Sequence, residues 1–249
     1  MGTGLTCALL LSILGALPAE QRSAPTTVAS GLVSVERRQF SARDGSGTIE
    51  VDILNKTKVQ VTAWLVSVNY TLSNGDKGQQ GILRDEYSVH LLPPRADAGP
   101  VGPNGVRRDA IVIPLPAGMT LEAVSVELTM VVFEDDTWSG DALSAKYLFE
   151  KRGREARVWG VIAEAMRQGR DVGGQAGLKK ALDHLEQSTS EVRQDPSLQT
   201  IRRNLERALA STLKVNPDDF LRTWVDRANE REQIAAAHLQ PKGIRSGGQ

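Results

Sequence analysis

The stretch VVFEDDTWSGD, from Val131 to Asp141, lies where the sequence changes its periodicity. Before it, apolar and polar residues alternate as they do in strands, and after it apolar residues recur at helical spacing. Asp141 precedes the helical pattern directly, in the position where a carboxylate accepts hydrogen bonds from the free amides of a helix start. The stretch therefore predicts a strand end, an acidic turn at residues 134–136 and a helix cap.

The same acidic residues have a second interpretation as a cation site, because hard cations take several oxygen ligands from a short loop. The candidate metal ligands are Glu134, Asp135, Asp136 and Asp141. Their spacing lacks the alternating acids and the distal Glu of a helix–loop–helix calcium site. We favour the strand end and cap over the cation site, and we predict no cofactor.

Upstream of this stretch, short runs alternate at period two. The clearest are TIEVDIL (48–54) and KVQVTAWLVSVNYTL (58–72), with NKTK as the turn between them. Further strands are predicted at 31–40, 81–92, 108–115 and 121–134. Six or seven short strands without an interposed helix predict an immunoglobulin-like antiparallel β-sandwich over residues 25–140.

Downstream, the pattern predicts a helical region over residues 141–240 and a disordered tail at 241–249. The first long helix covers 141–168, and the glycine-rich DVGGQAG after it is expected to be flexible. Its predicted apolar face consists of Leu143, Tyr147, Leu148, Val158, Ile162 and Met166. Shorter helices follow at 178–185, 198–213 and 220–228, the last two after the cap pairs Asp195–Pro196 and Asn216–Pro217. The predicted fold class is α+β, mainly β in the N-terminal half.

The N-terminus has an apolar run from Leu5 to about Leu17, followed by small residues. This run is too short to span a bilayer and is typical of a secretory signal peptide, which we assign to residues 1–24. The single cysteine, Cys7, lies inside it. The expected mature protein is thus secreted or periplasmic, has no thiol, keeps no stable membrane span and folds without disulfides.

Charge is balanced over the whole chain, with 30 basic and 30 acidic residues, which gives no electrostatic case for nucleic acid as a partner. The balance hides an asymmetry. Residues 1–143 carry 11 basic and 16 acidic side chains, and 144–249 carry 19 and 14, so the two halves have net charges of −5 and +5. This difference favours two parts with contact between them.

Catalytic motifs are not found: the sequence has no HExxH, no GxSxG elbow and no phosphate loop. Asp85, Glu86 and His90 could form an acid–base group, but we favour a solvated strand face as their explanation. His184 and His238 lie on predicted helices and are expected at the surface. We predict no catalytic residues.

Two segments could bind a partner. The loop PPRADAGPVGPNGVRRD (93–109) is long and rich in Pro and Gly, and its candidate ligand-binding residues are Arg95, Asn104, Arg107 and Arg108. Its other interpretation, which we favour, is an extended crossover between the two sheets. The basic stretch KRGREAR (151–157) is either a solvated helix face or a contact with an acidic partner or the acidic sandwich.

NKTKVQVTAWLVSV, PLPAG and VVFEDDTWSGD, running into a Tyr-Leu-Phe helix, together resemble a group of uncharacterised secreted bacterial proteins. In that group an Asn-x-Ser/Thr turn precedes an FEDGT strand end, a Gly-Asp step and a helix, and this chain has Asp136 where the commonest form has Gly. The similarity covers about residues 30–165. It implies an immunoglobulin-like fold and an envelope location, and no chemistry.

The sequence thus predicts a secreted or periplasmic binding or structural module that is not an enzyme, whose partner is an envelope protein or a glycan. A homo-oligomer is compatible with this, because the apolar stripe at 198–213 could serve self-assembly. The alternative is a hydrolase-like or cation-dependent enzyme that uses the carboxylates at 85–90 or 134–141.

Overall fold

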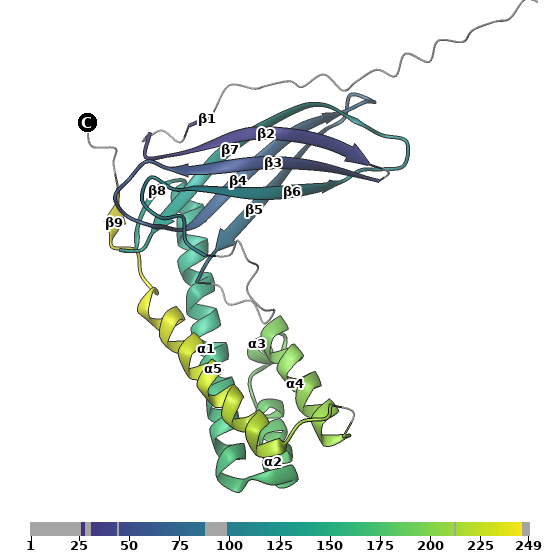
Figure 1. Cartoon of the computed structure of the whole chain (residues 1–249), viewed down its shortest axis with the longest axis vertical. Coiled ribbons are helices and arrows are strands. Elements are labelled where there is room, and N and C mark those ends of the chain that lie inside the picture. Colours follow the sequence, from purple (N-terminus) through teal and green to yellow (C-terminus); the bar gives the residue numbers. More distant parts are fainter. Residues whose placement is uncertain (1–25, 28–30, 44, 88–98, 212, 246–249) are drawn as a thin grey trace, which may run out of the picture.

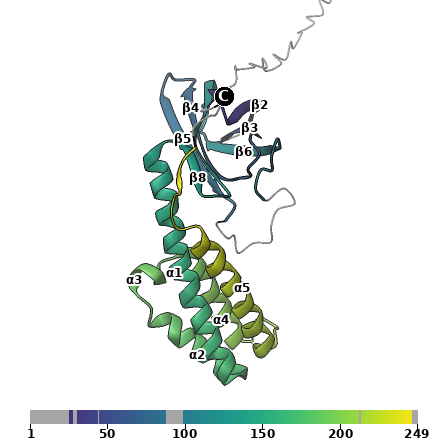
Figure 2. The same cartoon turned by 90° about the vertical axis from the view of Figure 1, so that its left-hand side faces the viewer.

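The computed structural model describes residues 26–27, 31–43, 45–87, 99–211 and 213–245 of the 249-residue chain. In these ranges the protein is α+β, with β-sheets in the N-terminal half and helices in the C-terminal half, as the sequence predicts. Figures 1 and 2 show the sheets at one end of the molecule and the helices at the other, joined by the long helix α1 (Ala142–Val172). The predicted signal peptide lies outside the described residues.

Two sheets form within the described residues. One has the strand order β1-β2-β3-β6 and is antiparallel; the other has the order β5-β4-β7-β8-β9 and is antiparallel except for the parallel pair β8–β9. The strands are β1 (Thr26–Thr27), β2 (Val33–Arg43), β3 (Ser46–Asn55), β4 (Val61–Leu72), β5 (Lys77–Asp85), β6 (Val106–Pro114), β7 (Leu121–Phe133), β8 (Thr137–Gly140) and β9 (Gly243–Ile244).

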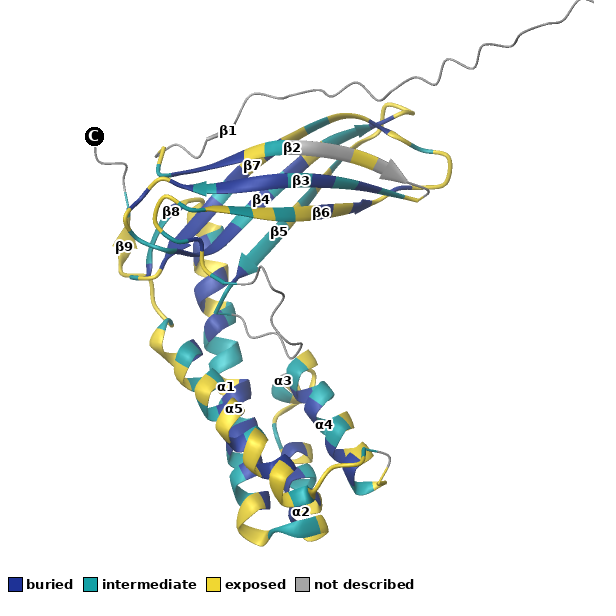
Figure 3. Cartoon of the chain, in the orientation of Figure 1, coloured by how far each residue is buried: buried dark blue, intermediate teal, exposed yellow. Residues whose placement is uncertain are grey.

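The two sheets enclose one apolar core. Side chains alternate between the two faces of a strand, and the apolar ones point into this core. Ile49, Val51 and Ile53 of β3 face Trp64 and Val66 of β4, and all are buried. Each such aliphatic side chain contributes about 1.5–3 kcal/mol when it leaves water. Figure 3 shows the central strands as the most buried part of the sheets.

The turn predicted from NKTK is built around Asn55, which is buried. Its side-chain amide donates to the carbonyls of Val59, Val101 and Gly102 at 2.8–3.0 Å, and its Oδ1 accepts from the backbone and hydroxyl of Thr57. Asn55 therefore ties the β3–β4 connection to the segment that precedes β6.

Helix α1 belongs to two apolar cores, and this is what holds the two halves together. Ala145, Leu148 and Phe149 near its start pack on Met130 and Val132, on the outer face of the second sheet. The rest of α1 packs in a helical bundle with α2 (Gly174–Glu186), α4 (Pro196–Leu209) and α5 (Pro217–Ala237), beside the short α3 (Ser190–Arg193).

The predicted helix caps are confirmed. Asp141 accepts from the Ser144 amide at 2.7 Å, Asp195 from the Ser197 amide at 2.8 Å, and Asn216 from the amides of Asp218 and Asp219. Each side chain satisfies amides that a helix start leaves without intrahelical partners.

Several predicted details differ from the structure. Leu143 and Tyr147 are 77% and 52% exposed, so neither belongs to the buried face of α1. The sequence missed β8 and β9, because both are too short to show a period. Part of the tail predicted as disordered, residues 243–244, lies beside β8 as β9.

The glycine-rich stretch after α1 is a tight helix–helix turn. Gly173 caps α1, and α2 starts at the next residue. Gly169 and Gly177 meet where α1 and α2 cross, since a Cβ on Gly177 would lie 2.3 Å from the Gly169 carbonyl oxygen. Glycine is required at this crossing by close backbone approach.

Candidate functional site

The candidate ligand-binding residues do not converge. Arg95 lies outside the described residues, and Asn104 is exposed in a turn with a φ of 54°. Arg107 and Arg108 belong to β6, because this strand begins earlier than predicted, at Val106. Consecutive strand residues point to opposite faces.

Each of these two arginines has its own partner. Arg107 pairs with Glu86 at 3.0 Å and lies 5.2 Å from the centroid of the Trp64 ring, whereas Arg108 is 60% exposed and lies 3.7 Å from Asp52. Glu86 is therefore engaged with Arg107, and His90, the third member of the hypothetical acid–base group, lies outside the described residues.

The four candidate metal ligands also have separate environments. Glu134 is exposed, Asp141 is the cap of α1, and Asp135 accepts from the amide and hydroxyl of Thr137 and pairs with Arg245. Asp136 alone points inward, where it is 1% exposed. In the part of the chain that the structure describes, no group of three or more His, Cys, Asp or Glu side chains could hold a metal ion.

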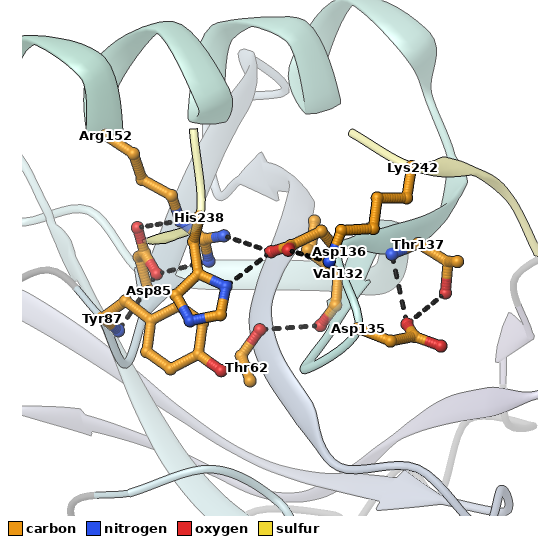
Figure 4. Close-up of polar contacts among 10 residues, drawn as sticks. All are labelled: Thr62, Asp85, Tyr87, Val132, Asp135, Asp136, Thr137, Arg152, His238 and Lys242. Atoms are coloured by element: carbon orange, nitrogen blue, oxygen red, sulfur yellow. Dashed lines mark hydrogen bonds and ion pairs between the residues drawn. The ribbon is translucent and has the colours of Figure 1, made fainter. Parts of the chain in front are cut away.

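Asp136 belongs to a cluster that we call the junction network, which consists of Asp85, Tyr87, Asp136, Arg152, His238 and Lys242 (Figure 4). These residues come from the end of β5, the β7–β8 turn, the middle of α1 and the segment between α5 and β9. The network lies where the sheets meet the helices.

Arg152 is the centre of the network and is fully buried. Its Nε and Nη2 donate to the two carboxylate oxygens of Asp85 at 3.1 and 2.8 Å, and its Nη1 lies 3.8 Å from Asp136. The guanidinium group also lies 4.8 Å from the Tyr87 ring centroid and 5.4 Å from that of Phe149. A fork of donors matched to a carboxylate is the strong form of this ion pair.

Asp136 ties the C-terminal segment to the sheet. Its carboxylate lies 2.7 Å from His238 Nδ1 and 3.1 Å from Lys242 Nζ, while its carbonyl accepts from the Lys242 amide. Its φ of 60° lies in the left-handed region, which costs a residue with a Cβ free energy. The turn conformation aims the carboxylate inward, so Asp136 fixes the chain that follows α5.

Tyr87 completes the network by stacking on His238, with ring centroids 4.1 Å apart and planes at 17°. Burial raises the pKa of the Tyr87 phenol, against the opposing effect of the Arg152 cation. His238 is thus not the solvated helix residue expected from the sequence: its side chain is 20% exposed and lies between Tyr87 and Asp136.

The pKa of Asp135, just outside the network, is shifted in the opposite direction. Burial alone would raise this pKa, but the hydrogen bonds from the Thr137 hydroxyl and amide and the Arg245 cation together lower it. The Asp135 carboxylate therefore stays ionised and holds Arg245, at the end of β9.

A groove of about 680 Å³ opens beside the face of α1 that carries Arg152, between this helix, β8 and the segment after α5. We call it the α1 groove. We group its lining residues by chemistry and call the apolar ones the floor and the polar and charged ones the rim. The floor consists of Trp138, Ala142, Ala145, Phe149, Gly153, Leu239 and Pro241, and the rim of Lys146, Glu150, Arg154 and Arg157, with Gln240. Three of the four charged rim residues are cations.

The sequence could have revealed part of the network. Arg152 follows the buried Ala145, Leu148 and Phe149 at helical spacing, so a charged residue occupies a position of the apolar face. A buried arginine needs a carboxylate partner, and one of the interpretations of KRGREAR was contact with the acidic sandwich. Arg152 contacts Asp85, which lies 67 residues away in the sequence, and Asp136 contacts His238, which lies 102 residues away. Contacts over such separations leave no local pattern in the sequence.

No helix among the described residues is both long enough and apolar enough to cross a membrane. A scan against protein-family models finds no match, and a search of curated proteins finds none either.

Two solved structures show a remote likeness. One is the Salmonella enterica trimeric lipoprotein SadB, with a TM-score of 0.29, 9% identity and coverage of 41% of this chain and 54% of that chain. The other is Northeast Structural Genomics Consortium target SoR45, with a TM-score of 0.25, 13% identity and coverage of 40% and 82%. We draw no conclusion about this chain from likenesses at this level.

Proposed function

We propose that the chain is a secreted or periplasmic, non-catalytic binding and structural module, in which an immunoglobulin-like sandwich carries a rigidly attached helical bundle. Export is supported by the apolar run at residues 5–17 and by the resemblance to uncharacterised secreted bacterial proteins. The immunoglobulin-like assignment is supported by two sheets around one core, with the chain crossing between them after β3, β5 and β6.

The α1 groove is the observation that carries the binding function. Large apolar side chains are exposed around it: Leu143 and Tyr147 on α1 are 77% and 52% exposed, and Leu239 and Ile244 are 39% and 70% exposed. Ile244 pairs in β9 with Trp138, which lines the groove. Apolar surface gathered at a groove is typical of an interaction site.

The polar groups that could act in catalysis are engaged elsewhere. Asp85 and Arg152 neutralise each other in the buried junction network, and Glu86 is paired with Arg107. A catalytic acid or base must reach its substrate, and groups held in buried ion pairs do not. These contacts support a structural role for the network and leave the groove as the candidate site.

Affinity capture from an envelope extract tests this function. The bait is the chain from residue 25, and its variant carries Leu143→Ser and Tyr147→Ser. The control, Val112→Ser, removes a 53% exposed apolar side chain from β6, away from the groove. We expect a partner that the wild type and Val112→Ser retain and the double variant loses. Equal retention by all three would contradict the groove as the binding surface.

A second candidate function, a hydrolase-like enzyme, is favoured by the 2.7 Å contact between His238 Nδ1 and the buried Asp136 carboxylate. A carboxylate in this place can orient an imidazole as a general base. Hydrolysis of nitrophenyl esters that is lost in His238→Gln would support it. We expect no such activity. Calcium added to chelated protein tests the cation-dependent version, and we expect an unchanged melting temperature.

A further inference from the structure

The face of α1 that forms the groove is the same face that α5 covers further along the helix. Gly160 contacts α5, since a Cβ there would lie 3.0 Å from Glu232 Oε1. Gly153 lines the groove seven residues earlier, which places it on the same side of the helix. The groove is therefore the unoccupied continuation of the α1–α5 interface.

Among the residues that the structure describes, none closes this continuation. Helix α5 ends at Ala237, and the following segment turns to β9, where Lys242 and Arg245 attach it to Asp136 and Asp135. It forms only one wall of the groove, through Leu239, Gln240 and Pro241. Figure 1 shows α5 stopping below the sheet while α1 continues to it.

The shape of the groove suits a helix. The α1 residues that line it recur at three- and four-residue spacing from Ala142 to Arg157, which spans about 24 Å at 1.5 Å per residue. Ala142, Ala145 and Gly153 are small, so a second helix could approach the α1 backbone closely. The groove is open along its length, whereas an acyl chain is better held by an enclosed cavity.

The charge on the rim selects the partner. Lys146 is 72% exposed at its side chain and lies 3.9 Å from the single acid, Glu150. Arg154 lies over the Tyr147 ring, and Arg157 donates to the Gly153 carbonyl. Three cations against one acid give the groove a net positive charge, which carboxylates beside a partner's apolar stripe would complement.

We propose that the α1 groove binds an acidic amphipathic helix of a partner protein, with its apolar side chains on Trp138 and Leu239 and its carboxylates near Lys146, Arg154 and Arg157. This assignment rests on the binding function proposed above and names its partner class. The mode is an apolar helix face laid into a groove, and the charges set specificity and association rate.

The test uses the chain from residue 25 and labelled peptides of about 16 residues, the length of the stripe. One peptide has Leu at helical spacing and Glu at the flanking positions, a second has Lys in place of Glu, and a third keeps Glu but has Ser in place of Leu. We expect fluorescence anisotropy to show binding of the Glu–Leu peptide, at least about tenfold weaker binding of the Lys peptide, and no binding of the Ser peptide.

Two variants test the site. Gly153→Leu places a bulky side chain in the groove, at a position where the nearest atom to a Cβ is Arg157 Nη1 at 4.0 Å, and it should abolish binding while helix content by circular dichroism is kept. Arg154→Glu with Arg157→Glu should reverse the preference between the Glu and Lys peptides. Lys180→Glu, on an exposed position of α2, is the charge control and should change nothing.

Several results would overturn the proposal: no binding of any peptide, equal binding of the Glu and Lys peptides, or binding that Gly153→Leu leaves intact. Phosphatidylglycerol vesicles that bind in preference to the peptides, and lose binding in Gly153→Leu, would assign the groove to anionic lipid instead. If no acidic peptide binds but envelope capture still depends on Leu143 and Tyr147, the binding module stands and only this occupant is wrong.

Discussion

Residues 145–157 of α1 present two neighbouring faces with different chemistry. On one, Arg152 is fully buried among two carboxylates and two aromatic rings. On the other, Gly153 borders an open groove with an apolar floor and a cationic rim. The face with Arg152 is closed and its charges are paired, while the groove face is open to a partner. The buried charge supports a structural role, and the groove is the site of the proposed binding role.

The largest effect is expected from the centre of the buried face. Arg152→Met would remove the cation that pairs with the buried Asp85 carboxylate, and breaking such a buried pair typically costs about 3–5 kcal/mol of unfolding free energy. The neighbouring change Lys151→Met removes an i,i+4 pair with Glu155 and should cost less than about 1 kcal/mol. Urea unfolding measures both. Similar losses in the two variants would show that burial of Arg152 does not hold the two halves together.

A smaller loss of unfolding free energy is expected at Asp136, where two variants distinguish the effect of the backbone conformation from that of the charge. Asp136→Ala removes the contacts with His238 and Lys242 while a Cβ remains at a φ of 60°. Asp136→Gly removes the same contacts and also the left-handed cost, so it should be more stable than Asp136→Ala by about 1 kcal/mol. Equal stability of the two variants in urea would mean that the turn conformation carries no cost here.

On the groove face, the expected effect is smaller and has the opposite sign. Gly153 lies within α1, and a Cβ there would meet no atom nearer than Arg157 Nη1 at 4.0 Å, so Gly153→Ala should stabilise the protein by about 0.5–1 kcal/mol. Gly177→Ala is the matched control on α2, where the Gly169 carbonyl leaves no room and a loss is expected. A loss in Gly153→Ala would show that the groove is packed more tightly than its geometry indicates.

Sequence patterns predicted those parts of the fold that depend on local chemistry. The alternation in TIEVDIL and the caps at Asp141, Asp195 and Asn216 act within a few residues, and β3 and the helix starts follow them. The apolar stripe at 198–213, considered for self-assembly, places Leu198, Ile201 and Leu205 inside the bundle. Amphipathic periodicity shows which face is buried, but not what covers it.

The junction network and the groove could not be predicted in the same way. Asp85, Asp136, Arg152 and His238 meet only because α1 crosses from the sheet to the bundle and α5 returns along it. The groove depends on where α5 ends, at Ala237, and this end has no glycine or proline signal nearer than Pro241. Long-range packing determines the junction network and the α1 groove. The charge asymmetry of the sequence indicated only that the two halves of the chain would be in contact.

The smallest effect concerns Tyr87 and appears only at alkaline pH. Burial raises its pKa above the ordinary value of 10.0, so the folded state holds the phenolic proton more tightly than the unfolded state. The stability that Tyr87 contributes is therefore fully present below about pH 10 and is lost as the pH rises through the folded-state pKa.

Tyr87→Phe keeps the ring that stacks on His238 but has no proton to lose. Melting temperatures of the two proteins should be close at pH 7 and should diverge above pH 10, where the wild type loses stability faster than the variant. Curves that stay parallel through that range would place the Tyr87 hydroxyl in water. The junction network would then be accessible to water at its edge, at Tyr87, although Asp85 and Arg152 are buried. The difference between the closed face of α1 and the groove would be limited to the surroundings of Arg152.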